Sequence, residues 1–235
     1  MKLLRIVLLI LVMMSASIEM TFAKSRTLTQ KELQEYKPLK ANEGRKLMPL
    51  SKAKLSDVHL VKAVKYFDIK SYEINYDDLI YTGGWSFDMA AYSRLSKYEK
   101  QKIRSVKPVK SKEPFGATYF LDSPMREIYN LHYIDMHSNV HTFASRKKLL
   151  DFLGEIDTPT ELHMALLNRE GEIRFKRLGN IYILRHKSVS FEDYDNDAYD
   201  CSVSIYHEIM DMKGTILLSK EISYKEYRGK KCEKL

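Results

Sequence analysis

The chain has 235 residues, of which 44% are hydrophobic and 30% are charged, and its formal net charge at pH 7 is +8. A chain of this length can bury a sizeable core, as one compact domain with an appendage or as two small domains. After the N-terminal segment, no stretch is long and apolar enough to span a membrane, which excludes a protein with several membrane spans.

Residues 1–23 have the pattern of a secretory signal peptide. Two basic residues precede an apolar run from Ile6 to Met14, and Ala23 is a small residue suited to cleavage. Polar residues interrupt the run well before the roughly 20 apolar residues that a membrane span needs. We therefore expect a mature chain that begins at Lys24, exported as a soluble protein to the periplasm or the cell exterior. Cleavage removes a net charge of +1, so the formal charge falls from +8 to +7.

Residues 24–56 predict a weakly packed N-terminal arm. This segment is rich in lysine and poor in periodic apolar residues, and three breakers of regular structure follow each other at Pro38, Gly44 and Pro49. The sequence from Thr29 to Glu32 is a capping-box pattern, which predicts one short helix.

Residues 57–235 predict the folded body, with a sub-boundary near residues 105–115 as an alternative division. Its first part is rich in β-branched and aromatic residues with imperfect alternation, which predicts strands before a turn at Gly83-Gly84. A second capping box at Ser96 to Glu99 then predicts a short helix that ends near Arg104.

A basic block covers this helix and the segment after it. It contains eight basic residues and one acid, a net charge of +7 that equals the charge of the whole mature chain. Such a block can attract a polyanion, and for an exported protein we expect an anionic envelope glycan or lipid surface and not genomic nucleic acid. The alternative is a solvated face that keeps the protein soluble. The basic residues are Arg94, Lys97, Lys100, Lys102, Arg104, Lys107, Lys110 and Lys112.

The next segment predicts strands at residues 117–121 and 127–136 and a turn at Ser138-Asn139, and it concentrates histidines. Because side chains alternate along a strand, the turn decides which of these groups share a face. A two-residue turn places His132 and His141 on one face, whereas a three-residue turn that begins at His137 places Asp135 opposite His141.

His132, Asp135 and His141 are therefore the candidates for a metal or catalytic site, and they support an alternative function as a small hydrolase or metalloenzyme. Either turn brings at most two histidines together, whereas a zinc site needs three or four ligands. A missing ligand would have to come from elsewhere in the chain. We accordingly expect no metal and no cofactor, and we favour a structural hairpin.

Two helices are predicted near the middle of the chain. Ser145 precedes an amphipathic segment at residues 146–153, and Gly154 is suited to end that helix. The segment Thr158 to Glu161 combines a cap, a proline at the first helical position and a glutamate at the third, so it predicts a helix that continues to Gly171.

The remaining sequence predicts two hairpins, with turns at Gly179-Asn180 and at residues 211–214. Their strands are predicted at residues 172–178, 181–186, 202–210 and 215–224. The fold class is therefore α+β: a largely antiparallel sheet built from hairpins, two short central helices, and the N-terminal arm.

Cys201 and Cys232 are the two cysteines of the chain. An even pair in an exported protein predicts a disulfide, because oxidising compartments preserve such bonds. It would close a loop of about 30 residues and stabilise the chain by roughly 3–4 kcal/mol.

The stretch RKKLLDFLGEIDTPTELHMALL, followed by a strand-rich tail with Cys201, Gly214 and Cys232, resembles the C-terminal regions of uncharacterised exported bacterial proteins. The resemblance covers about residues 140–235. It implies export and a disulfide, and no activity or catalytic residue comes with it.

No Gly-x-Ser-x-Gly elbow, phosphate loop, dinucleotide fingerprint or His-Glu-x-x-His helix is present in the sequence. We therefore expect an exported, non-catalytic binding or interaction protein of the bacterial cell envelope. The enzyme built on His132, Asp135 and His141 is the alternative.

Overall fold

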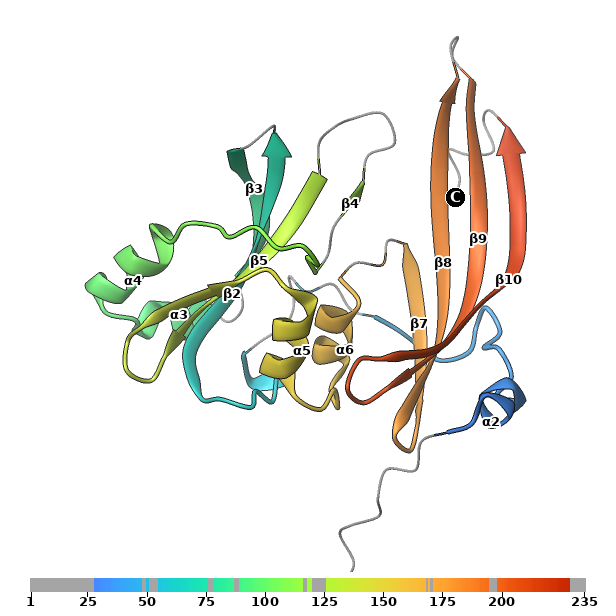
Figure 1. Cartoon of the computed structure of the whole chain (residues 1–235), viewed down its shortest axis with the longest axis horizontal. Helices are drawn as coiled ribbons and strands as arrows, with labels where there is room; N and C mark the ends of the chain where they lie inside the picture. The colour runs from blue at the N-terminus through green and yellow to red at the C-terminus, as the bar shows by residue number, and fades with distance from the viewer. Residues whose placement is uncertain are drawn as a thin grey trace, which may run out of the picture. The chain divides into compact units, whose positions relative to one another are not determined.

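The computed structural model shows an α+β protein with mainly antiparallel sheets and short helices (Figure 1). The chain divides into two compact units, residues 1–36 and 37–235, which are described separately. The predicted signal peptide and Cys232 lie outside the described residues. The structure describes residues 28–47, 50, 55–75, 78–86, 89–115, 118–119, 126–167, 169, 171–194 and 198–228.

The described part of the first unit contains helix α2 (Gln30–Glu35). The Thr29 hydroxyl accepts a hydrogen bond from the backbone N–H of Glu32, and the Glu32 carboxylate accepts one from the backbone N–H of Thr29. This reciprocal pair is the capping box that the sequence predicted.

Five antiparallel strands form what we call the C-terminal sheet, in the order β1-β7-β8-β9-β10. Strands β7 to β10 follow one another as hairpins, because turn residues separate runs of strand-forming residues. Strands β8, β9 and β10 run side by side (Figure 1). The strands are β1 (Arg45–Lys46), β7 (Glu172–Leu178), β8 (Ile181–Tyr194), β9 (Ala198–Asp211) and β10 (Ile216–Arg228).

A second five-stranded antiparallel sheet, which we call the central sheet, has the order β3-β2-β5-β4, and β6 pairs with β5. β2 pairs along most of its length with β5, although the two strands are separated by about 50 residues of sequence. Its strands are β2 (Val64–Asn75), β3 (Asp78–Ser86), β4 (Thr118–Tyr119), β5 (Arg126–Asp135) and β6 (Val140–Phe143).

The helices of the second unit are all short. None in the described part of the chain is long and apolar enough to cross a membrane. The capping boxes predicted for α4 and α6 are both present, and Pro159 opens α6 as expected. The helices are α3 (Met89–Arg94), α4 (Lys97–Arg104), α5 (Arg146–Leu153), α6 (Pro159–Ala165) and the 3-10 helix η2 (Leu55–Asp57).

Several predicted boundaries are wrong, and two strands are longer than predicted, since β8 continues to Tyr194 and β9 already begins at Ala198. Gly83-Gly84 is not a turn, because both residues lie inside β3, opposite Ser71 and Lys70 of β2, beside a shift of register. A Cβ on Gly84 would lie 2.2 Å from the carbonyl oxygen of Ile69, so Gly84 allows close backbone approach at a bulge. Helix α6 ends at Ala165, well before the predicted end at Gly171.

The β5–β6 hairpin has neither of the two predicted registers. Ile134 lies opposite Val140 and Tyr133 opposite His141, and the backbone N–H of Asp135 donates to the carbonyl oxygen of Asn139. The connection is therefore a three-residue loop, and Ser138 adopts a positive φ of 67° in it. An extra left-handed residue of this kind is typical of three-residue hairpins.

The core of the second unit consists of three apolar clusters. Residues of α5 pack against one face of the central sheet, and residues of α3 and α4 pack against its other face. Residues of α6 pack against the C-terminal sheet. Arg146 at the start of α5 donates to the carbonyl oxygens of Ala165 and Gly214, so it connects the helix pair with the β9–β10 turn.

The later part of the predicted N-terminal arm packs more closely than we predicted. Leu47 belongs to the apolar cluster at the C-terminal sheet, and Leu50 belongs to the cluster under α5. β1 also pairs with β7, with Arg45 opposite Phe175. Buried leucines and strand pairing therefore attach this segment to the body.

Candidate functional site

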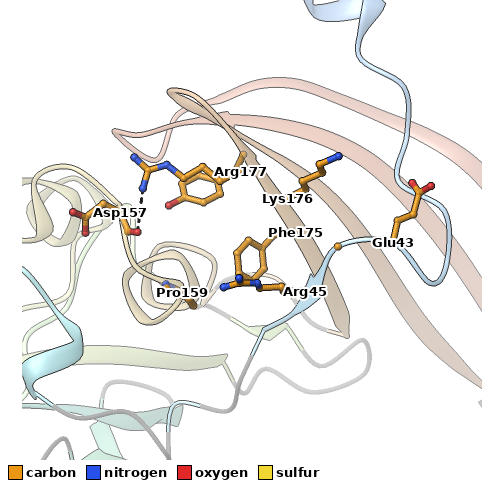
Figure 2. Close-up of a pocket in the computed structure, with 9 residues that line it drawn as sticks. Glu43, Arg45, Asp157, Pro159, Phe175, Lys176 and Arg177 are labelled. Carbon is orange, nitrogen blue, oxygen red and sulfur yellow. Dashed lines mark hydrogen bonds between the residues drawn. The ribbon is translucent and has the colours of Figure 1, made fainter.

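A hollow of about 590 Å³ lies where β1, β7 and the start of α6 meet (Figure 2). It combines a buried aromatic base with a charged rim, which suits recognition of a small polar ligand. We call it the β1–β7 hollow. Its lining residues are Glu43, Gly44, Arg45, Asp157, Pro159, Phe175, Lys176, Arg177 and Tyr182.

The base of the hollow depends on close packing of β1 against β7. Gly44 has a φ of 76°, and a Cβ there would lie 2.6 Å from the carbonyl oxygen of Phe175, so only glycine fits. Phe175 and Tyr182 are both buried, with ring centroids 6.1 Å apart in an edge-to-face arrangement. The Tyr182 hydroxyl donates to the carbonyl oxygen of Ile156 at 2.9 Å, and burial raises the pKa of this hydroxyl.

The two acidic side chains at the rim already have partners. Glu43 Oε2 accepts a hydrogen bond from the backbone N–H of Lys40 at 3.0 Å. Asp157 Oδ1 lies 3.0 Å from His59 Nδ1. Burial acts to raise the pKa of Asp157, but hydrogen bonds with Glu161 and His59 outweigh it and hold that pKa below its usual range. Both carboxylates are therefore already hydrogen-bonded within the protein.

The basic side chains at the rim have fewer partners within the protein than the acidic ones. Arg177 donates to the backbone carbonyl oxygens of Gly179 and Asp157, at 3.2 and 3.3 Å, and Figure 2 shows the second of these contacts. Arg45 and Lys176 are exposed, and neither side chain forms a hydrogen bond or ion pair with any residue that the structure describes. The uncompensated charge at the hollow is therefore positive.

His59, Asp157 and Glu161 form a group whose potential ligand atoms lie within 4.8 Å of one another, the spacing that a metal ion would require. Glu161 is completely buried, and burial raises its pKa. Its carboxylate accepts backbone hydrogen bonds from His59, from Asp157 at 2.9 Å and from Thr158 at 3.0 Å. These donors occupy most of the lone pairs of the Glu161 carboxylate. The group of three residues is therefore better suited to cap helix α6 by hydrogen bonds than to bind a cation.

The structure brings together only two of the three residues of the predicted enzyme site. His141 Nε2 lies 2.8 Å from Asp135 Oδ2, and the His141 ring stacks on Tyr133 with centroids 4.6 Å apart. His132 lies opposite Thr142, so it faces the other side of the hairpin from His141. His132, Asp135 and His141 therefore do not converge on one site.

His132 instead belongs to a polar cluster buried in the central sheet. Its Nε2 lies 3.1 Å from the Tyr72 hydroxyl, and its Nδ1 lies 2.8 Å from Thr142 Oγ1. Asp68 lies directly opposite His132 on β2 and is only 6% exposed. Burial, followed by the charge of Lys70, lowers the pKa of His132 to about 3.

Sequence analysis missed Asp68. In the sequence, Asp68 and Lys70 alternate with apolar residues, the pattern of a strand with one face in water. The structure covers that face with α3, α4 and the segment after α4. Lys70 Nζ donates to the carbonyl oxygen of Ile103, and Asn130 Oδ1 accepts from the backbone N–H of Val109. No pattern in the local sequence predicts that these elements cover this face of the strand.

The predicted basic block forms the end of α3, α4 and the segment that follows, and several of its side chains have structural roles. Lys100 Nζ donates to the carbonyl oxygen of Ser93 and Arg104 Nε to the Tyr92 hydroxyl, both at 2.8 Å. Lys102 Nζ lies 4.4 Å from the Tyr98 ring centroid. Arg94, Lys97, Lys107, Lys110 and Lys112 are exposed or half-buried.

Cys201 is buried on β9, opposite Tyr227 of β10. Its predicted partner, Cys232, lies outside the described residues, so the disulfide stays a prediction.

No protein-family model, curated protein or solved structure matches this chain.

Proposed function

We propose that this chain is an exported, non-catalytic binding protein of the bacterial cell envelope, and that the β1–β7 hollow binds a small anionic molecule. The supporting observation is the charge imbalance at its rim. Glu43 and Asp157 have partners within the protein, whereas Arg45 and Lys176 have none among the described residues. A carboxylate or phosphate group on the ligand would supply the missing countercharge.

The size and exposure of the hollow favour a small ligand. Its volume of about 590 Å³ lies within the range of small-molecule sites. Phe175 at its base is 6% exposed, so little apolar surface is available to a ligand. Recognition would therefore depend mainly on charge, and because exposed charges are screened by salt, binding would weaken as ionic strength rises.

The side chains around the hollow favour binding over catalysis. A general base or nucleophile needs a group that can reach the substrate. The Tyr182 hydroxyl is committed to the carbonyl oxygen of Ile156, and Asp157 is paired with His59. The available groups are the cations of Arg45 and Lys176, which can hold an anion in place.

Replacing Arg45 and Lys176 together by glutamine is expected to weaken binding of a small anion at least tenfold. Hydrogen bonds to charged groups contribute about 1.5–3 kcal/mol each, and tenfold corresponds to about 1.4 kcal/mol. Calorimetric titration of the mature protein with citrate and with inorganic phosphate at low salt measures the effect.

The matched control replaces Lys147 and Lys213, which are exposed and away from the hollow, by glutamine. This variant has the same change of charge and should bind like the wild type. An equal loss of affinity in both variants would show that the overall charge of the protein, and not the hollow, attracts the anion. If neither citrate nor phosphate bound to the wild type, the proposal would be contradicted.

We further propose the disulfide between Cys201 and Cys232 as part of the exported state. β10 returns the chain beside Cys201, and Cys232 follows four residues after Arg228 at the end of β10. A bridge requires Cα atoms within about 7 Å, and Tyr227, five positions before Cys232, already lies opposite Cys201.

Mass spectrometry of the unreduced exported protein is expected to show the linked peptides. Reduction is expected to lower the free energy of unfolding by roughly 3–4 kcal/mol, because the unfolded chain then gains entropy. The variant with both cysteines replaced by serine should be insensitive to reductant. Alkylation of both thiols in the native protein before reduction would contradict the bridge.

A further inference from the structure

We propose that the surface formed by α3, α4 and the β5–β6 turn docks on an anionic lipid bilayer. This inference goes beyond the proposed ligand site and does not depend on it, because none of the residues involved lines the β1–β7 hollow. We call this surface the docking corner. Its residues are Met89, Arg94, Lys97, Tyr98, Lys102 and Met136.

The docking corner exposes three large apolar side chains. Met89 is 63% exposed, Tyr98 62% and Met136 55%. Single exposed apolar residues are common on protein surfaces and carry no meaning alone. Here they lie on three elements that meet at one end of the central sheet (Figure 1).

Contacts between the elements show that this surface is continuous. Met136 of the β5–β6 turn and Arg94 of α3 line the same shallow hollow of about 530 Å³, together with Glu99 of α4. Lys102 lies over the Tyr98 ring and donates to the carbonyl oxygen of Ser138, which joins α4 to the turn. Arg94, Tyr98, Lys102 and Met136 therefore belong to one continuous surface, and Met89 and Lys97 are exposed on the same two helices.

The charge of the docking corner is positive because its acid is neutralised internally. Glu99 Oε1 lies 2.7 Å from Lys65 Nζ and accepts from the Ser138 hydroxyl at 2.8 Å. Hydrogen bonds from Lys65, from Ser96 and from Ser138 lower the pKa of Glu99 to about 2, so it stays ionised and paired. Arg94 and Lys97 are exposed and have no partner among the described residues.

Side-chain contacts within the protein also fix the arrangement of the elements that form the docking corner. Arg104 Nε donates to the Tyr92 hydroxyl, which joins α4 to α3. Tyr92 packs on Tyr66 of β2 with ring centroids 5.3 Å apart. A preformed patch loses little conformational freedom on binding, which favours adsorption as a rigid unit.

This combination of side chains fits a lipid surface better than another polyanion. Arginine and lysine attract anionic headgroups, while tyrosine and methionine can enter the boundary between headgroups and acyl chains. An acidic glycan would engage the cations but offers no apolar phase to the three exposed apolar side chains. An anionic bilayer therefore accounts for both the basic and the apolar side chains of the docking corner.

Co-sedimentation of the mature full-length protein with vesicles tests the proposal. The protein is expected to bind vesicles of equal parts phosphatidylglycerol and phosphatidylcholine, and to bind phosphatidylcholine vesicles at least tenfold more weakly. Met136→Asp is expected to lower the affinity for the mixed vesicles at least tenfold. The double replacement Arg94→Gln and Lys97→Gln is expected to lower it about thirtyfold, since each basic residue near an anionic membrane contributes about 1 kcal/mol.

Two matched variants test whether the effect belongs to the docking corner. Leu178→Asp changes an apolar side chain that is 38% exposed on β7, and the pair Lys147→Gln and Lys148→Gln removes two exposed charges from α5. Both variants should bind the mixed vesicles like the wild type. Circular dichroism of every variant establishes that it is folded.

Heparin binding separates the lipid from a general polyanion. If Met136→Asp leaves vesicle affinity unchanged while the basic variant weakens heparin and vesicles alike, the surface is an electrostatic polyanion site and the lipid proposal is overturned. It is equally overturned if the wild type fails to bind the mixed vesicles at low salt. A loss with Met136→Asp that is clearly larger for vesicles than for heparin supports it, because the added negative charge acts on both partners and the lost apolar contact only on the bilayer.

Discussion

Asp68→Asn is expected to stabilise the folded chain, and to do so much more at pH 8 than at pH 4. Asp68 is 6% exposed, and its Oδ1 atom forms no hydrogen bond with any residue that the structure describes. Burial raises the pKa of Asp68 from 3.8 to about 7, although the positive charge of Lys70 acts to lower it. The folded protein therefore has to accommodate a buried carboxylate once the pH exceeds that value.

The direction of the pH effect follows from the two pKa values. Because the folded chain holds the Asp68 proton more tightly than the unfolded chain, the protonated carboxyl group contributes stability below pH 3.8. This contribution is lost as the pH rises through about 7. A difference of about three pKa units corresponds to about 4 kcal/mol, which is the upper limit for the gain from Asp68→Asn at pH 8.

His132 has the opposite pH dependence. Burial lowers its pKa from 6.5 to about 3, so stability is lost as the pH falls below 6.5. Both the wild type and the Asp68→Asn variant keep His132, so their difference in unfolding free energy isolates Asp68.

Urea unfolding of the two proteins at pH 4, 6 and 8 measures this difference. Asp151→Asn, which changes an exposed aspartate on α5, is the matched control and should show a small difference at every pH. A constant effect of Asp68→Asn from pH 4 to pH 8 would contradict an elevated pKa. Destabilisation at pH 8 would mean that the ionised carboxylate has a favourable partner.

Glu161→Ala is expected to destabilise the folded chain by about 3 kcal/mol or more. The Glu161 carboxylate accepts backbone hydrogen bonds from His59, Asp157 and Thr158, and its side chain has no solvent exposure. Removing it leaves three partly buried N–H donors without their acceptor, and each unsatisfied buried donor costs about 1–3 kcal/mol. Denaturant unfolding at neutral pH measures the loss.

The matched control for this prediction is Glu32→Ala in α2. Glu32 occupies the same position in a capping box, and its hydrogen bonds with Thr29 are exposed to solvent. Loss of such a cap costs about 1 kcal/mol. If Glu161→Ala cost no more than Glu32→Ala, the hydrogen bond from His59, a residue about 100 positions away, would contribute nothing measurable.

These two glutamates show which part of the structure local sequence can predict. The capping boxes that begin at Thr29, Ser96 and Thr158 are all present, because their hydrogen bonds join residues three positions apart. The hairpins β7–β8 and β9–β10 were predictable for the same reason, since their turns lie between adjacent strand-forming runs. The α+β class follows from these local elements.

The sequence predicted two alternative registers for the β5–β6 hairpin, and neither is correct. Both predicted registers of the β5–β6 hairpin are wrong, by two or by three positions, because Ser138 adopts a left-handed conformation that its residue type does not require. Gly83-Gly84 was predicted as a turn, but both residues lie in β3, and the backbone of β2 approaches Gly84 closely. Register depends on the partner strand as well as on the turn.

The sequence by itself therefore determined helices α2, α4 and α6 with their capping boxes, the hairpins β7–β8 and β9–β10 and the fold class, because neighbouring residues make the interactions that define them. Only the tertiary structure decided that Asp68 is buried, because α3 and α4 cover a strand face whose alternation resembles a solvent-exposed one. The tertiary structure also decided where the β1–β7 hollow forms, because Arg45 and Phe175 are about 130 residues apart in the sequence and meet only through strand pairing. Contacts at such separations depend on the whole fold, and no local pattern encodes them.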